Sequence, residues 1–267
     1  MIPNPALLGL FLLAVLQKPR PIDEAPSPER IEATCAALET AFGPGADPST
    51  ALEAVKASIG VPSPRVVALL DAKGLRAEDA ALRAAAIEAL GRLPRPEARK
   101  ALEGALKRDR KALQKDPPGF AALLRAIARH GDPASIPVLT DELFQSPDRT
   151  VVTARILGLA RIRTRESVDE LMRLMRSSPH HKVEDYMPDF RLALARLTGA
   201  DKGSSQELWG SWYGEHKNDP GVSPEPPELA PELQRRWDLY WGREGAPAGR
   251  RKGEARRERK RGSESGE

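Results

Sequence analysis

Apolar residues recur along this chain at the three- and four-residue spacing of amphipathic helices, and one such pattern occurs four times. The four stretches begin at residues 85, 122, 154 and 190, which gives spacings of 37, 32 and 36 residues. Their third positions are all bulky and apolar: Ile87, Leu124, Ile156 and Leu192. Their sixth positions are bulky in the first three and small in the last: Leu90, Ile127, Leu159 and Ala195. This period is typical of helical repeats.

Each stretch is followed by a short turn and a second amphipathic stretch. A helical pair of this size cannot bury its apolar side alone, so neighbouring pairs must stack. We therefore predict an all-α, right-handed α-solenoid of about five antiparallel helical pairs over residues 49–217. The predicted pairs are 49–72, 79–93 with 96–107, 118–130 with 133–144, 148–162 with 165–176, and 185–197 with 204–217. Asp79, Asp132 and Asp148 precede apolar runs as N-caps should.

Composition adds two constraints. The chain has 267 residues, 40% of them hydrophobic and only 4% aromatic, which suits helices packed through small and aliphatic side chains. Its single cysteine, Cys35, excludes an internal disulfide and a Cys-based zinc site, and we expect it to pack as a small hydrophobe. The net charge of +4 is local: residues 250–261 carry +6, which leaves −2 for the remainder.

The N-terminal region divides into residues 1–21 and 22–48. Ala6–Leu16 is an uncharged run of eleven residues, too short for the roughly 20 that span a bilayer, and it is typical of a secretory signal peptide. No basic residue precedes the run and no Ala-x-Ala site follows it, so a buried N-terminal helix in a cytoplasmic protein is the alternative to export into the periplasm or envelope. Residues 22–48 are expected to form a helix, begun by Ser27 and Pro28, that covers the open end of the stack.

Residues 218–267 differ from the repeats. A Pro-rich linker comes first, and residues 231–242 predict a short helix with Leu233, Trp237 and Trp241 on one side. Beyond Gly242 we predict a disordered basic tail. Its cations are candidates for non-specific contact with nucleic acid or an anionic membrane surface: Arg250, Arg251, Lys252, Arg256, Arg257, Arg259, Lys260 and Arg261. The alternative is that the tail is simply solvated.

The repeats resemble a known family. Their apolar pattern, their short polar turns and the Asp132-Pro133 start of a second helix resemble HEAT-type and PBS-lyase-type helical repeats over residues 49–217. The last unit, Leu197-Thr-Gly-Ala-Asp201 followed by Trp209-Gly-Ser-Trp-Tyr213, resembles a terminal motif of HEAT-repeat proteins from planctomycetes. The resemblance implies an α-solenoid that takes part in protein–protein assembly, and it carries over no catalytic residue.

Two clusters are candidate sites. Arginines recur on the first helices of successive repeats and are candidates for a face that binds an acidic peptide or another carboxylate-bearing partner: Arg125, Arg129, Arg155, Arg161 and Arg191, with Arg163 and Arg196 beside them. The alternative is that they pair with acidic residues of the second helices: Asp141, Glu142, Asp169 and Glu170. A terminal cluster is expected to cap the last groove of the stack: Asp201, Trp209, Trp212 and Tyr213.

The function that these observations favour is a non-catalytic scaffold whose partner is another protein, without cofactor, metal or small-molecule substrate. Neither a Gly-x-Ser-x-Gly elbow nor a Walker-type loop is present in the sequence. His180 and His181 point to different sides of a helix, which makes them poor metal ligands, and we expect them in a solvated turn. The alternatives are a nucleic-acid-binding protein that uses its tail, and a lyase-like or DNA-glycosylase-like enzyme built around Asp201 and Trp209.

Overall fold

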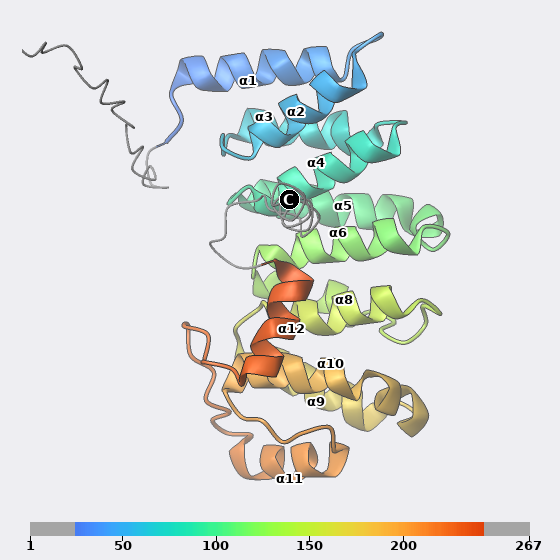
Figure 1. The fold of residues 1–267 in the computed structure, drawn as a ribbon, viewed down its shortest axis with the longest axis vertical. Coiled ribbons are helices and arrows are strands. Elements are labelled where there is room, and N and C mark those ends of the chain that lie inside the picture. The colour runs from blue at the N-terminus through green and yellow to red at the C-terminus, as the bar shows by residue number, and fades with distance from the viewer. Residues whose placement is uncertain (1–24, 243–267) are drawn as a thin grey trace, which may run out of the picture.

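The computed structural model describes residues 25–242 (Figure 1). Between those limits the chain forms twelve α-helices, two short 3₁₀-helices and no strand. The α-helices are α1 (Pro28–Ala41), α2 (Pro48–Ser58), α3 (Pro64–Ala72), α4 (Ala80–Arg92), α5 (Pro96–Leu113), α6 (Pro117–Arg129), α7 (Ile136–Thr140), α8 (Arg149–Leu159), α9 (Arg165–Ser177), α10 (His180–Thr198), α11 (Gln206–His216) and α12 (Pro231–Trp241). The 3₁₀-helices are η1 (Gly74–Arg76) and η2 (Pro133–Ser135).

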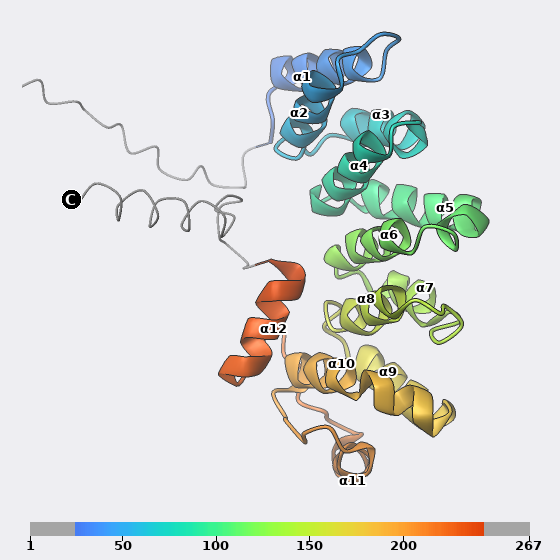
Figure 2. The same cartoon turned by 45° about the vertical axis from the view of Figure 1, so that its right-hand side comes forward.

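The helices stack as five consecutive pairs along the long axis of the molecule, and α1 covers the first pair (Figure 1). Helices α2, α4, α6, α8 and α10 each contact the next and make up what we call the first-helix layer. Helices α3, α5, α7, α9 and α11 make up the second-helix layer, which lies on the other side of the stack (Figure 2). The predicted all-α solenoid is therefore confirmed.

Local sequence signals start most of these helices. Eight of the twelve α-helices have a Ser, Thr or Asp at the N-cap whose side-chain oxygen accepts a backbone N–H: Ser27, Asp47, Ser63, Asp79, Asp116, Asp148, Thr164 and Ser205. Such a bond satisfies one of the free donors of the first turn. Asp132 caps η2 in the same way. The cap positions predicted for Asp79, Asp132 and Asp148 are thus confirmed.

The repeated apolar positions form the core. The third and sixth residues of the four stretches are all buried, from Leu90, fully enclosed, to Ile87, 9% exposed. Cys35 is also buried, as expected, and burial raises the pKa of its thiol. Small residues let successive helices approach closely: a Cβ at Gly91 of α4 would stand 2.8 Å from the Cα of Ala126 in α6. Any larger residue at position 91 would therefore push these helices apart.

Three boundaries differ from the predicted ones. The helix expected over 133–144 is split into η2 and the short α7, because Asp141 leaves the helical region and Glu142 has a φ of 49°. Arg110 of α5 pairs with both acids, at 3.2 Å from Asp141, and holds that turn. Helix α5 continues six residues beyond the expected end, to Leu113. Helix α10 begins at His180, so the expected turn is wrong: the His pair is solvent-exposed, as expected, but it lies in the first turn of a helix.

The predicted Trp helix is α12, and it turns back against the first-helix layer beside α8 and α10 (Figures 1 and 2). Within residues 25–242 none of the helices combines the length and apolar character needed to cross a membrane. The predicted signal segment at 1–21 and the basic tail at 250–261 lie outside the residues that the structure describes.

Candidate functional site

The predicted arginine row lies mainly where α12 crosses the solenoid. Three guanidinium groups stack on aromatic rings of α12: Arg125 on Tyr240 at 5.6 Å, Arg161 on Trp241 at 5.3 Å and Arg196 on Trp237 at 4.9 Å, measured from Cζ to the ring centroid. A fourth, Arg191, lies 3.6 Å from the carboxylate of Glu232 at the start of α12. We call these four residues the arginine face. Each of the three cation–π contacts is worth about 0.5–1 kcal/mol when exposed and more when water is excluded.

Helix α12 meets this face with the apolar side that its sequence predicts. Leu233, Trp237 and Trp241 are 4%, 1% and 9% exposed, at the i, i+4, i+8 spacing of one helix face. The indole N–H groups of both tryptophans are buried and have no hydrogen-bond partner among residues 25–242. Helix α12 also lacks a side-chain N-cap. The helix is thus held by apolar burial and by stacked arginines rather than by directional hydrogen bonds from its indoles.

Arg163 anchors the linker that leads to α12. Its guanidinium donates to the carbonyl oxygens of Ser223 at 2.7 Å and Glu225 at 3.0 Å, and also to that of Arg196 at the end of α10, at 2.6 Å. Burial lowers the pKa of Arg163. Five donors on a planar group suit this task, since one guanidinium can satisfy carbonyls from two segments at once. The linker is therefore bound to the same end of the stack as α12.

Two members of the predicted row do not lie on the arginine face. Arg155 is 5% exposed and donates to the carbonyl oxygen of Val138 at 2.8 Å, so its placement on a binding face is wrong. Burial lowers the pKa of Arg155 to about 10, which leaves it protonated at neutral pH. Arg129 instead pairs with Glu88 of α4. The reason is geometric: a helix carries its side chains all round, and positions 129 and 155 turn toward neighbouring helices.

The acids that are the alternative partners of these arginines pair with other residues. Asp141 and Glu142 pair with Arg110. Glu170 pairs with Arg173, the residue three positions later on α9, at 2.6 Å. Asp169 accepts the hydroxyl of Tyr213 at 2.7 Å. Asp169 also lies 3.5 Å from Arg165, so all four acids are engaged by residues outside the arginine face.

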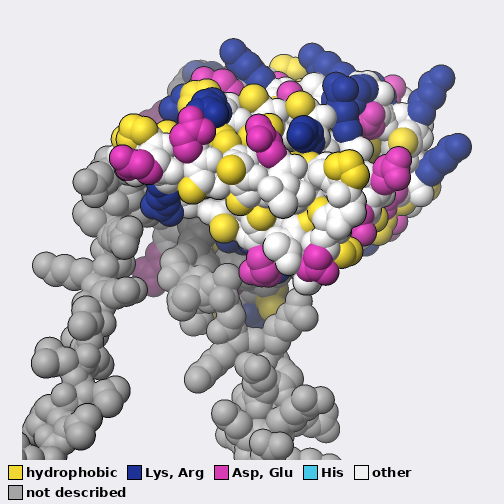
Figure 3. Space-filling view, turned by 90° about the horizontal axis from the view of Figure 1, so that it is seen from above, with side chains coloured by type: hydrophobic (Ala, Val, Ile, Leu, Met, Phe, Trp, Pro, Cys, Tyr) yellow, Lys and Arg dark blue, Asp and Glu magenta, His cyan; other side chains and the backbone are white. Residues whose placement is uncertain are grey.

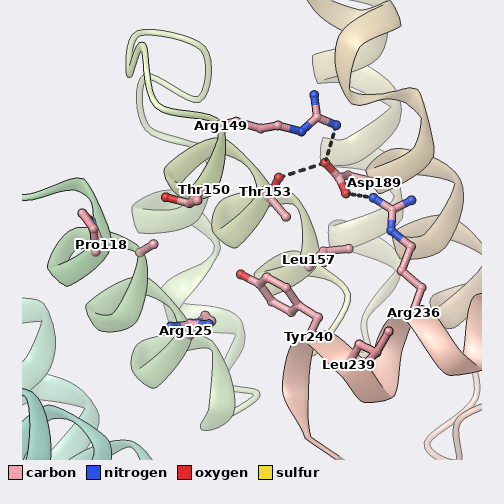
Figure 4. Close-up of a pocket in the computed structure, with 11 residues that line it drawn as sticks. Pro118, Arg125, Arg149, Thr150, Thr153, Leu157, Asp189, Arg236, Leu239 and Tyr240 are labelled. Atoms are coloured by element: carbon pink, nitrogen blue, oxygen red, sulfur yellow. Dashed lines mark hydrogen bonds and ion pairs between the residues drawn. The ribbon is translucent and has the colours of Figure 1, made fainter.

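One buried carboxylate and an open pocket complete the site (Figure 4). Asp189 of α10 is 1% exposed. Its carboxylate accepts a hydrogen bond from the hydroxyl of Thr153 at 2.9 Å and forms an ion pair with Arg236 of α12. The guanidinium of Arg149 lies 3.7 Å from the same carboxylate. Asp189 and residues of α6, α8 and α12 line an open pocket of about 550 Å³. Sequence reasoning missed Asp189 and Arg236. The available signal was a lone carboxylate in the apolar run of α10, a position that must face either the core or a cationic partner.

The terminal cluster closes the last pair of helices. Trp209 is fully buried, and its indole N–H donates to the carbonyl oxygen of Gly203 at 2.9 Å. Trp212 packs edge-on against it at 5.6 Å and is 7% exposed. Asp201 pairs with Arg191 at 2.5 Å, and this bond holds the pKa of the carboxyl below its usual value. These contacts leave Asp201 and Trp209 engaged in packing, which favours the capping interpretation over a ligand pocket.

Other surfaces show less organisation. Viewed from the α1 end, basic, acidic and apolar side chains are intermixed, without a continuous patch of one sign (Figure 3). Within the part of the chain that the structure describes, no group of three or more His, Cys, Asp or Glu side chains is placed to hold a metal ion. The tail cations proposed to contact polyanions are outside that part.

Comparison with known proteins agrees with this architecture. Residues 110–185, from the end of α5 to the first turns of α10, match the family model for HEAT repeats. No curated protein matches the chain significantly. HEAT-type solenoids commonly bind other proteins along an extended surface built by successive repeats. The matched residues include α6, which supplies Arg125, and α8, which forms one wall of the pocket and is followed by Arg161 in the next turn. Residues 110–185 of this all-α solenoid are thus similar to HEAT repeats.

Proposed function

We propose that this protein is a non-catalytic interaction scaffold that holds a partner protein on its first-helix layer, next to α12. The observation that carries the proposal is that the arginine face already recognises a helix: four arginines, from α6, from the turn after α8 and from α10, contact aromatic or acidic residues of α12. A surface that binds one amphipathic helix in this way has the aromatic, apolar and charged groups that protein interfaces enrich. The resemblance of the Leu197–Tyr213 motif to planctomycete HEAT-repeat proteins supports a role in assembly.

Exposed apolar residues give a direct test. Leu239 of α12 and Leu208 of α11 are 79% and 57% exposed, and they are the exposed large hydrophobic side chains of the structure's described part. Leu239 borders the pocket, whereas Leu208 lies on α11, the last helix of the second-helix layer. A photo-crosslinking residue, p-benzoylphenylalanine, placed at either position of the full-length chain therefore samples two surfaces of similar character.

We expect the crosslinking residue at position 239 to capture one dominant partner protein after irradiation in cells, and we expect the same residue at position 208 to capture none. Mass spectrometry identifies that partner, and titration calorimetry with the purified proteins measures its affinity. Equal capture at both positions, or capture at Leu208 alone, would contradict a partner site beside α12. Partners lost only after nuclease treatment would instead favour the alternative function, nucleic-acid binding through the basic tail.

A further inference from the structure

The pocket between α12 and the solenoid contains hydrogen-bond donors that have no acceptor in the part of the chain that the structure describes. Arg125 stacks on the ring of Tyr240 but has no carboxylate partner among residues 25–242, and the Tyr240 hydroxyl has no hydrogen-bond partner there. Both side chains line the pocket, with the hydroxyl directed toward its interior (Figure 4). Burial raises the pKa of Tyr240, so its hydroxyl remains protonated and able to donate. Two donors from α6 and α12, neither of them paired with an acceptor among residues 25–242, thus face one space.

The charge around this space is positive. Three guanidinium groups, from Arg125, Arg149 and Arg236, line the pocket against a single carboxylate, that of Asp189. Asp189 is buried and already engaged by Thr153 and Arg236, so it does not offer a free acceptor to the other donors. Arg149, 57% exposed, rests over the ring of Tyr186 at 4.9 Å and keeps its charge at the pocket rim. An anionic group would therefore enter a site that already favours negative charge.

The remaining wall is apolar. Leu157 is 1% exposed and Ala121 is 5% exposed, so they form a solid base, while Pro118 and Leu239 stand at the rim. A bulky side chain that covers this wall would remove apolar surface from water, a gain of roughly 25 cal/mol per Å². The pocket thus has an apolar wall next to a positively charged one.

We propose that this pocket receives a carboxylate carried next to a bulky apolar side chain of a partner protein, with Arg125 and the Tyr240 hydroxyl as donors to the carboxylate. This inference rests on the proposed scaffold function and names the chemistry that its partner must present. Helix α12 is then a wall of the binding site, since it supplies Tyr240, Arg236 and Leu239. A carboxylate there forms charge-assisted hydrogen bonds, the stronger class of such bonds.

The test uses the full-length, ¹⁵N-labelled chain and three small probes. The first probe, N-acetylphenylalanine, has both a carboxylate and a bulky apolar side chain. The second, N-acetylphenylalanine amide, lacks the negative charge, and the third, N-acetylalanine, lacks the bulky side chain. We expect N-acetylphenylalanine to shift amide signals of α6, α8 and α12, and we expect each of the other probes to bind about tenfold more weakly. Equal affinity for the acid and its amide, or shifts confined to other helices, would overturn the proposal.

Variants assign the donors. Arg125→Gln should weaken N-acetylphenylalanine about tenfold, and Tyr240→Phe, which keeps the stacked ring and removes only the hydroxyl, should weaken it about fivefold. Arg173→Gln is the matched control, because Arg173 pairs with Glu170 on the second-helix layer and should leave the affinity unchanged. Unchanged affinity in both pocket variants with well-preserved spectra would contradict the assignment.

The two proposals fail separately. Probe binding needs no partner protein, so selective binding of the acid together with absent capture at Leu239 would refute the scaffold function and keep the pocket chemistry. Capture at Leu239 that is insensitive to Arg125→Gln and Tyr240→Phe, together with no selective probe binding, would refute the pocket and keep the scaffold.

Discussion

The two tryptophan pairs of this protein, one in α11 and one in α12, have the same residue type and four- or three-residue spacing but different roles. In α11, Trp209 is fully buried and its N–H is bonded to the Gly203 carbonyl. In α12, Trp237 is equally buried, yet its N–H has no acceptor and its ring instead faces the guanidinium of Arg196. The first pair completes the core of the last repeat, whereas the second attaches a separate helix to an assembled surface.

The two pairs differ in whether the buried indole N–H forms a hydrogen bond. A buried indole N–H normally finds a partner, because leaving it unpaired costs about 1–3 kcal/mol. The α11 pair avoids that cost through the loop at Gly203. The α12 pair does not, and its attachment depends on burial and cation–π contacts from the arginine face. We therefore expect α12 to be the more weakly held of the two.

The largest effect on stability is expected when the side chain of Trp209, which belongs to the α11 pair, is shortened. Trp209→Ala should lower the free energy of unfolding by about 3–5 kcal/mol, since it removes a fully buried aromatic side chain and leaves a cavity. Urea titration monitored by far-UV circular dichroism measures the loss. The exposed Leu208→Ala on the same helix is the control, with an expected change within about 0.5 kcal/mol. A loss below about 1 kcal/mol for Trp209→Ala would contradict the capping role.

A smaller effect is expected at the carboxylate that ties α12 to α10. Asp189→Asn leaves Arg236 without its charged partner and should lower the free energy of unfolding by about 1–3 kcal/mol. Hydrogen exchange should accelerate in α12 while α11 keeps its protection, which separates local release from global unfolding. Asp185→Asn, exposed on the same helix, should change neither measurement. Equal acceleration in α11 and α12 would show that the two regions open together.

Paired Trp→Phe substitutions sharpen the comparison directly. Trp209→Phe leaves the Gly203 carbonyl without its indole donor, whereas Trp237→Phe removes an N–H that has no acceptor among residues 25–242. The first should therefore cost about 1–2 kcal/mol more than the second, as measured by urea unfolding. Because both changes remove a similar volume, cavity effects largely cancel in the difference. Equal losses would mean that the indole N–H groups do not distinguish the two sites.

The smallest effect concerns pH, at the residue that links the two regions. Arg191 pairs with Asp201 before α11 and approaches Glu232 of α12. Since Arg191 lowers the pKa of Asp201, its stabilising contribution is complete above the ordinary value of 3.8 and is lost as the pH falls through the lower, folded-state pKa.

The contribution itself should be below about 1 kcal/mol, because the pair is partly exposed. Asp201→Asn should accordingly differ from wild type near neutral pH and converge with it in acid, when thermal unfolding is followed as a function of pH. A difference that grows on acidification would contradict this assignment.

The candidate site was only partly predictable. The repeated arginines drew attention to positions 125, 161 and 191, which do lie on the arginine face. Arg155 carries the same sequence signal, yet it is buried against the carbonyl of Val138. Tyr240 and Arg236, which line the pocket, come from a helix whose docking position the sequence pattern did not predict. A periodic pattern identifies a side of a helix, but it does not identify the element that covers that side.

By itself the sequence determined the helices, their caps and the apolar positions of the stack, because these depend on neighbours three or four residues away and on a repeat of near-constant length. The tertiary structure alone decided where α12 docks, which arginines it meets and that a pocket remains beside it. Those contacts join residues such as Arg125 and Tyr240, which are more than a hundred positions apart. Such pairs form only after the repeats have assembled the surface on which the returning helix packs.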